Sequence, residues 1–138
     1  MSTVIAQDIN EGSLYLNFEV DLSAAAAITA TRGTGVTASK TGTGQYTFTI
    51  KGGTRGIKLV ETLMRTCDLS GTPATAFWGK VTSGPTQTSG GTNDGDITVV
   101  VTTLSNAATP VAADTTGACT LSVAMCLRTV RDPAVAVI

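Results

Sequence analysis

Histidine is absent from this 138-residue chain, and its absence removes the most common routes to catalysis. Imidazole is the usual base beside a nucleophilic serine or cysteine, and it is the commonest zinc ligand. The acidic residues are scattered along the chain and do not suggest a paired-carboxylate site. The sequence therefore predicts a protein that is not an enzyme, with no assigned catalytic, cofactor-binding or metal-binding residues.

Charged residues are also scarce, at 14% of the chain, and the formal net charge is −1. A nucleic-acid-binding protein is expected to carry a basic surplus, which is missing here. No stretch approaches the roughly 20 apolar residues of a membrane span, and the start of the chain lacks the basic region of a secretory signal. We expect neither nucleic acid nor a membrane as partner, and the nearly neutral surface favours self-association.

The three cysteines are too few and too unevenly spaced for a disulfide framework. Cys119 and Cys126 are an odd number of residues apart, so on one strand they would face opposite sides. The sequence predicts that Cys67, Cys119 and Cys126 are buried free thiols in a protein made in a reducing cytoplasm.

Threonine is abundant where charge is missing, at 26 of the 138 positions. Its branched, half-polar side chain suits the exposed face of a pleated sheet and is less suited to a helix. Lys, Glu and Gln, the usual residues of helix surfaces, are rare. This composition predicts an all-β fold with little helix.

Alternating apolar residues predict most of the strands. The clearest runs are 13–20, 45–51, 74–82, 96–104 and 118–130. Two Gly-Thr-Gly units bracket a further short strand, with a hairpin at 41–44, and both precede strands, so they indicate turns and not a dinucleotide-binding loop. Segment 24–31 fits a strand or a short helix, and 57–67 also fits both; we favour a strand for each.

Two segments rich in turn-forming residues, 83–95 and 105–117, predict long exposed loops. Seven or eight strands without alternating helices then predict a single-domain β-sandwich, of jelly-roll or immunoglobulin-like type, over residues 13–130. Residues 1–12 and 131–138 are expected to form arms. The apolar end of the chain suggests that an arm packs on a neighbouring subunit.

Two features are weak candidates for binding sites. Asn93-Asp94-Gly95-Asp96 clusters the side-chain oxygens that calcium prefers, but the EF-hand spacing is missing and an Asx-rich turn is the commoner outcome. Trp78 lies beside Phe77 on a predicted strand. It could stack on a sugar, although packing in the core or at a subunit interface is commoner.

Two stretches resemble small virion proteins of tailed bacteriophages. One is Val36–Ile50, in which a Gly-Thr-Gly-x-Tyr-Thr turn opens a threonine-alternating strand. The other is Leu121–Thr129, an apolar strand that ends near an arginine. The resemblance implies a β-sandwich subunit, often a trimer, that sits on the capsid and clamps neighbouring major capsid subunits, or a part of a fibre. It brings no catalytic residues with it.

The leading hypothesis is a capsid decoration (cement) protein of the virion. Its partners would be the major capsid protein and other copies of itself, most often as a homotrimer. The alternative is a tail or head-fibre module that binds host glycans through loops 83–95 and 105–117 and Trp78. A secreted adhesin is disfavoured by the missing signal.

Overall fold

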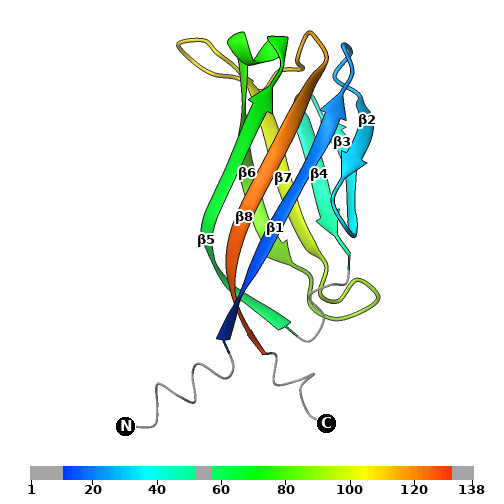
Figure 1. The fold of residues 1–138 in the computed structure, drawn as a ribbon, viewed down its shortest axis with the longest axis vertical. Coiled ribbons are helices and arrows are strands. Elements are labelled where there is room, and N and C mark those ends of the chain that lie inside the picture. Colours follow the sequence, from blue (N-terminus) through cyan, green and yellow to red (C-terminus); the bar gives the residue numbers. More distant parts are fainter. Residues whose placement is uncertain (1–10, 52–56, 132–138) are drawn as a thin grey trace.

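A computed structural model describes residues 11–51 and 57–131 and shows a β-sandwich of eight strands in two antiparallel sheets (Figure 1). The first sheet, sheet A, has the order β2-β1-β8-β5, and the second, sheet B, has the order β3-β4-β7-β6. The elements are β1 (Glu11–Leu22), β2 (Ile28–Arg32), β3 (Val36–Gly42), β4 (Gln45–Ile50), β5 (Ile57–Ser70), the single 3₁₀ turn η1 (Thr72–Thr75), β6 (Phe77–Gln87), β7 (Ile97–Ser105) and β8 (Cys119–Arg131). The predicted fold class is confirmed.

The core lies between the sheets and follows directly from the alternation in the sequence. Phe18 on β1 and Phe48 on β4 meet across the sandwich with ring centroids 4.7 Å apart. The central strands contribute the remaining side chains, and the largest that are fully buried are Tyr46, Phe18, Phe48, Leu22, Ile97, Leu121, Met125 and Leu127. Burial of this apolar set is the main stabilising contribution to the fold.

The outer face of sheet B explains the threonine content. Thr37, Thr49, Thr98 and Thr86 pair in register, one on each of the four strands, and so form a row across the whole sheet. Next to this row, Thr41 and Thr47 exchange a hydrogen bond of 3.0 Å, and Thr82 and Thr102 exchange one of 2.8 Å. β-branched side chains pack well against each other on a pleated surface, while their hydroxyls bond to neighbours or to water.

Most predicted strands are confirmed, and the ambiguous segment 57–67 is a strand, β5. Two predicted strands begin later than expected. Segment 24–31 opens with a turn in which Ser23 N–H donates to the Ala27 carbonyl, so β2 begins only at Ile28. Segment 74–82 opens within η1, where Pro73 suits the first turn of a short helix, and β6 begins at Phe77.

The predicted loop over 83–95 is wrong in its first part, because β6 continues to Gln87. Glycine and proline suggested a loop, but β6 is the edge strand of sheet B, where a proline without an N–H is tolerated. A register shift in the pairing with β7, between Ser83 and Thr86, accommodates Gly84 and Pro85. The true loop, 88–96, is closed by Thr88 N–H donating to the Asp96 carbonyl.

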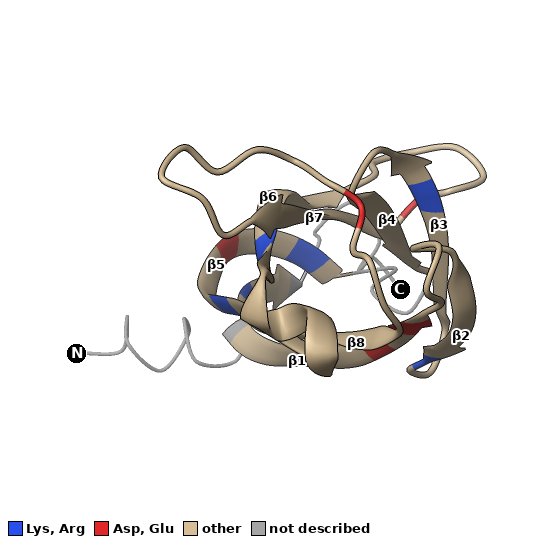
Figure 2. Ribbon diagram, turned by 90° about the horizontal axis from the view of Figure 1, so that it is seen from above, with Lys and Arg blue, Asp and Glu red and all other residues tan. Residues whose placement is uncertain are grey.

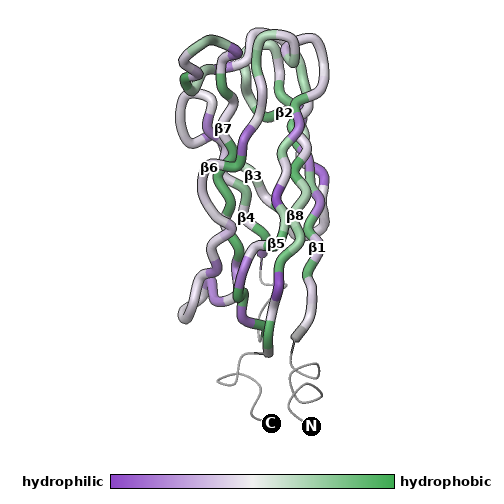
Figure 3. The backbone as a smooth tube through the Cα atoms, turned by 90° about the vertical axis from the view of Figure 1, so that its left-hand side faces the viewer, coloured by the Kyte–Doolittle hydropathy of each residue, from purple (hydrophilic) through white to green (hydrophobic). Residues whose placement is uncertain are grey.

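β1 and β8 are neighbours in the middle of sheet A, although they lie at opposite ends of the sequence. Their pairing is continuous from Glu11 opposite Val130 to Leu22 opposite Cys119. The start of β1 and the end of β8 therefore lie at the same end of the sandwich (Figure 3). The strands reach one or two residues beyond the predicted domain limits of 13 and 130, and the rest of both predicted arms lies outside the described residues.

Within the described ranges, no helix is long and apolar enough to cross a bilayer.

Candidate functional site

The outer face of sheet A divides into a polar half and an apolar half. Pairing aligns its outward side chains in rows that run across β1, β8 and β5. Rows near the Leu22 end of β1 carry carboxylates and hydroxyls, and a row near its other end carries Tyr15, Cys126 and Met64.

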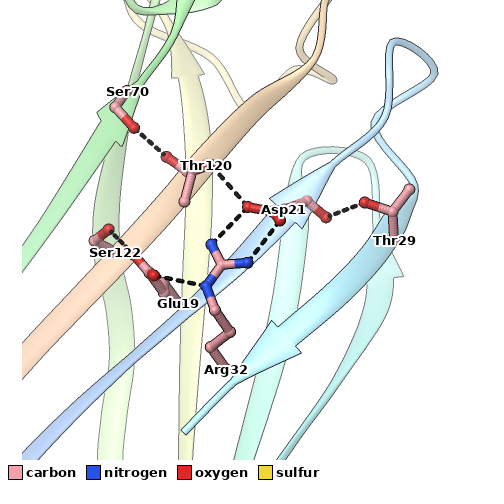
Figure 4. A network of polar contacts seen from close by, with 7 residues as sticks. All are labelled: Glu19, Asp21, Thr29, Arg32, Ser70, Thr120 and Ser122. Carbon is pink, nitrogen blue, oxygen red and sulfur yellow. Dashed lines mark hydrogen bonds and ion pairs between the residues drawn. The ribbon is translucent and has the colours of Figure 1, made fainter.

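In the polar half, Arg32 joins two acidic residues of β1 (Figure 4). Its Nε donates to Glu19 at 2.6 Å, and its two terminal nitrogens donate to the two carboxylate oxygens of Asp21 at 2.7 Å each. From β8, Thr120 Oγ1 donates to Asp21 at 2.8 Å and Ser122 Oγ donates to Glu19 at 3.0 Å. This polar network is internally satisfied and ties three strands together.

The network keeps both carboxylates ionised. Hydrogen bonds from Arg32, and then from Thr120, lower the pKa of Asp21 to about 2. Hydrogen bonds from Arg32 and Ser122 also lower the pKa of Glu19. Charge-assisted bonds of this kind are among the stronger surface contacts, and they order the sheet without creating a reactive group.

In the apolar half, large hydrophobic side chains are open to solvent. Tyr15 is 75% exposed, Leu63 is 54% exposed, and Met64 lies in the same row as Tyr15 with the buried Cys126 between them. A hydrogen bond with Cys126 raises the pKa of the Tyr15 phenol, which therefore remains neutral. We call Tyr15, Leu63, Met64 and Cys126 the apolar patch.

Two β-bulges in β5 help to expose the patch. Pairing with β8 shifts between Leu59 and Glu61 and again between Thr62 and Met64, which leaves Val60 and Leu63 as extra residues. Both extra side chains are exposed. A bulge bends its strand and redirects side chains, so these two residues leave the alternation that would have buried one of them.

A groove runs beside the apolar patch, where the edge strands of the two sheets face each other. Its volume is about 640 Å³, and it is lined by residues 57–62 of β5, 85–89 at the end of β6, and Asp94 and Gly95. The side chain of Gln87 spans it, with Leu59 N–H donating to Oε1 at 2.9 Å and Nε2 donating to the Ile57 carbonyl at 2.6 Å. Further along, Arg65 donates to the Gly84 carbonyl at 2.6 Å.

The Asn93–Asp96 segment has the geometry of a turn. Asp94 accepts a hydrogen bond from Gly90 N–H at 2.7 Å, while the buried Asp96 lies 3.6 Å from the Lys51 ammonium. The two carboxylates are thus directed to different partners. Within the described part of the chain, no three Cys, Asp or Glu residues are grouped closely enough to hold a metal ion.

Trp78 lies on the outer face of sheet B, 39% exposed, opposite Leu104 of β7. Leu104 is also bridged to Ala112 of the second loop, so Trp78 and that loop share one end of the sandwich. Loop 88–96 lies at the opposite end (Figure 1). The two loops and Trp78 therefore do not form the common glycan site that the sequence suggested.

Acidic and basic residues are distributed over both sheets (Figure 2). Beyond the polar network, ion pairs between described residues are spread over β3, β5, β8 and the loops, and include Lys40–Asp114, Lys51–Asp96 and Arg128–Glu61. The described surface therefore gives little support to binding by charge alone, and the apolar patch is the stronger candidate site.

Comparison of the chain with protein-family models, curated proteins and solved structures finds no match. The fold places the described part of the chain among all-β proteins, as a β-sandwich.

Sequence reasoning missed the apolar patch, although a signal was present. Tyr15 falls on the outward face of a clean alternation, where a polar residue is the usual choice. Leu63 and Met64 are consecutive, so one of them must leave the core face of a strand. Their meeting with Tyr15 depends on the β1-β8-β5 order, which no local pattern reveals.

Proposed function

We propose that the protein is a non-enzymatic subunit that binds the outside of a tailed-phage capsid and stabilises the contacts between major capsid subunits. The observation that carries this proposal is the apolar patch. Large side chains gathered on one exposed face are typical of a surface that a partner covers. The resemblance of Val36–Ile50 and Leu121–Thr129 to small virion proteins supplies the kind of partner.

The surroundings of the patch resemble the anatomy of a protein interface. Its centre is aromatic, sulfur-containing and aliphatic, with Tyr15 and Met64 as the exposed anchors. On one side lies the polar network, and on the other the Arg128–Glu61 ion pair. An apolar centre inside a polar rim is how stable interfaces are built.

Such a subunit would act by mass action. A protein that binds only the assembled shell adds its binding free energy to that shell and so opposes its disassembly. The nearly neutral charge suits this role, because long-range repulsion would not oppose a dense layer of copies on one particle.

The test uses capsids of the phage that encodes this chain, prepared without the protein and then supplied with it. We expect the addition to raise the temperature at which the capsids release DNA. The double variant Tyr15→Ser, Met64→Ser should bind the capsid at least about tenfold more weakly, since it removes two exposed anchors.

The matched control is Asn17→Ser, Thr66→Ser, which changes the neighbouring row of the same strands and removes only one methyl group of apolar area. It should bind like the parent. Capsids that are equally heat-stable with and without the protein, or equal binding by both double variants, would refute the proposal.

A further inference from the structure

The bonds that Gln87 makes to β5 imitate those of a missing strand. Among the described strands, β5 is the edge of sheet A and pairs with β8 alone. On its other side, the Gln87 amide donates to the Ile57 carbonyl and accepts from Leu59 N–H. One residue of an added parallel strand would offer its own N–H and carbonyl oxygen to the same two groups. The Gln87 side chain thus bonds to backbone groups of β5 with which an added strand could pair instead.

We propose that the groove between β5 and β6 is a strand-addition site that takes residues 132–138 of a second copy of this chain, with Gln87 holding the site until that segment arrives. Pairing of an extended segment with an open sheet edge is a general mode of recognition, in which backbone bonds supply affinity and side-chain pockets supply specificity. This inference deepens the proposed function, because it names how copies of the subunit would join.

The segment fits the groove in length and chemistry. Residues 134–138, Ala-Val-Ala-Val-Ile, have no charged side chain and include three β-branched side chains. Five extended residues span about 17 Å, which matches the stretch of β5 that lines the groove, residues 57–62. Ile57, Leu59 and Val60 offer apolar contacts there, and Pro85 faces them from β6.

The place where β8 ends favours insertion of the segment into a second copy over insertion into the same molecule. β8 ends at Arg131, directly opposite Ile57, so the molecule's own groove lies back along β5 and on its far side. To enter that groove, the chain would have to reverse and cross β5 within Asp132 and Pro133. A residue before proline favours an extended backbone, which makes such a sharp reversal at Asp132 costly.

The first experiment measures molar mass by light scattering for the full chain and for a chain ending at Arg131. We expect the full chain to be oligomeric and the shortened chain to be monomeric. The full-length variant Val135→Asp, Val137→Asp should also dissociate, and it keeps the test valid if the shortened chain fails to fold. A monomeric full chain, or an oligomer that survives both changes, would overturn the proposal.

The second experiment measures binding of a synthetic peptide, Asp-Pro-Ala-Val-Ala-Val-Ile, to the chain ending at Arg131. Gln87→Ala should bind it several-fold more tightly than the parent, because the competing amide is gone. Gln45→Ala, an exposed glutamine of β4, is the matched control and should leave the affinity unchanged. A peptide with Pro in place of Val135 and Val137 lacks two backbone N–H groups and should bind at least about tenfold more weakly.

If Gln87→Ala leaves peptide affinity unchanged, the proposal that Gln87 occupies the site until the segment binds is wrong. If the full chain is monomeric and only the shortened chain binds the peptide, the segment occupies its own groove and the second-copy assignment is wrong. Capsid binding through the apolar patch is measured separately. A shortened chain that still protects capsids would show that the proposed function stands without strand addition.

Discussion

Tyr46 shows how a single polar atom is accommodated in this core. Its side chain is fully buried, and its hydroxyl donates to the Ala26 carbonyl at 2.7 Å. Burial raises the pKa of Tyr46 to about 12, so the phenol keeps its proton and remains a donor. Ala26 itself has a positive φ of 62°, a conformation that non-glycine residues rarely adopt. The hydroxyl therefore helps to hold a strained turn against the core.

We expect Tyr46→Phe to lower the free energy of unfolding by about 1–2 kcal/mol, because the buried Ala26 carbonyl would lose its hydrogen-bond partner. Urea denaturation followed by circular dichroism measures this change. Tyr15→Phe, at an exposed position, should change stability by less than about 0.5 kcal/mol. Equal effects of the two substitutions would contradict the role assigned to the Tyr46 hydroxyl.

The ion pairs of Arg32 make the stability of the folded protein depend on pH in a direction that can be predicted. Because Arg32 lowers the pKa of Asp21 and Glu19 in the folded protein, the unfolded chain binds protons more readily. The stabilisation is therefore present above the ordinary aspartate pKa of 3.8 and is lost as the pH falls toward about 2.

Arg32→Met should make the urea midpoint less sensitive to pH between those two values. Lys58→Met, which removes an exposed cation elsewhere in sheet A, is the control and should leave the pH profile parallel to that of the parent. If the Arg32→Met and parent profiles are parallel, the network does not control the acid response.

At the scale of elements, the sequence predicted strands wherever one face is buried. Tyr46, Phe48 and Ile50 alternate because they face the core, and this physical cause is also the visible pattern. β5 is different, since most of its side chains are exposed and two bulges break its period. Because no buried face imposes a regular alternation on β5, its sequence fits both a helix and a strand pattern.

The end of β6 and the apolar patch were beyond local reasoning for a related cause. Gly84 and Pro85 are read as loop residues unless the strand is known to lie at a sheet edge. Tyr15 and Met64 fall in one row only because β8 pairs with both of their strands. Sheet order is set by the global packing of strands, which no short window of sequence contains.

Gly79 sets how closely β6 approaches sheet A. A Cβ at this position would lie 2.7 Å from Cys67 Sγ and 2.9 Å from Leu121 Cδ2, both inward-facing atoms of sheet A. We expect Gly79→Ala to cost about 1–3 kcal/mol of unfolding free energy through overpacking. Denaturant titration measures the loss.

The double variant Gly79→Ala, Cys67→Ala removes the closer of the two clashing atoms. It should be more stable than the sum of the two single losses predicts, by about 1 kcal/mol. Simple additivity would show that the two positions are not in contact.

For the molecule as a whole, the cysteines report on global unfolding. All three are free thiols; Cys119 and Cys126 are buried and Cys67 is half-buried. Burial raises the pKa of Cys67 to about 12 and also raises that of Cys119, so neither supplies thiolate near neutral pH. The sequence prediction of free thiols is confirmed, and Cys119 and Cys126 lie on opposite faces of β8 as expected.

A thiol reagent at pH 8 should therefore label the native protein much more slowly than the urea-unfolded chain. The labelling rates of Cys67 and Cys119 should rise together across the same urea range in which circular dichroism is lost, since both thiols face the core between the sheets. Rapid labelling of Cys67 without urea would indicate local opening at the β5 edge.

The central place of β8 also has a consequence for the order of events during synthesis. Sheet A cannot close while β8 is still within the ribosome, because β1 and β5 touch each other only through it. β1, the first of the described strands, must therefore wait for most of the chain to be translated before the edge that pairs with β8 is covered. Pairings so distant in sequence form slowly and leave unpaired edges open meanwhile. A nascent chain of this protein would accordingly be a substrate for chaperones until its eighth strand emerges.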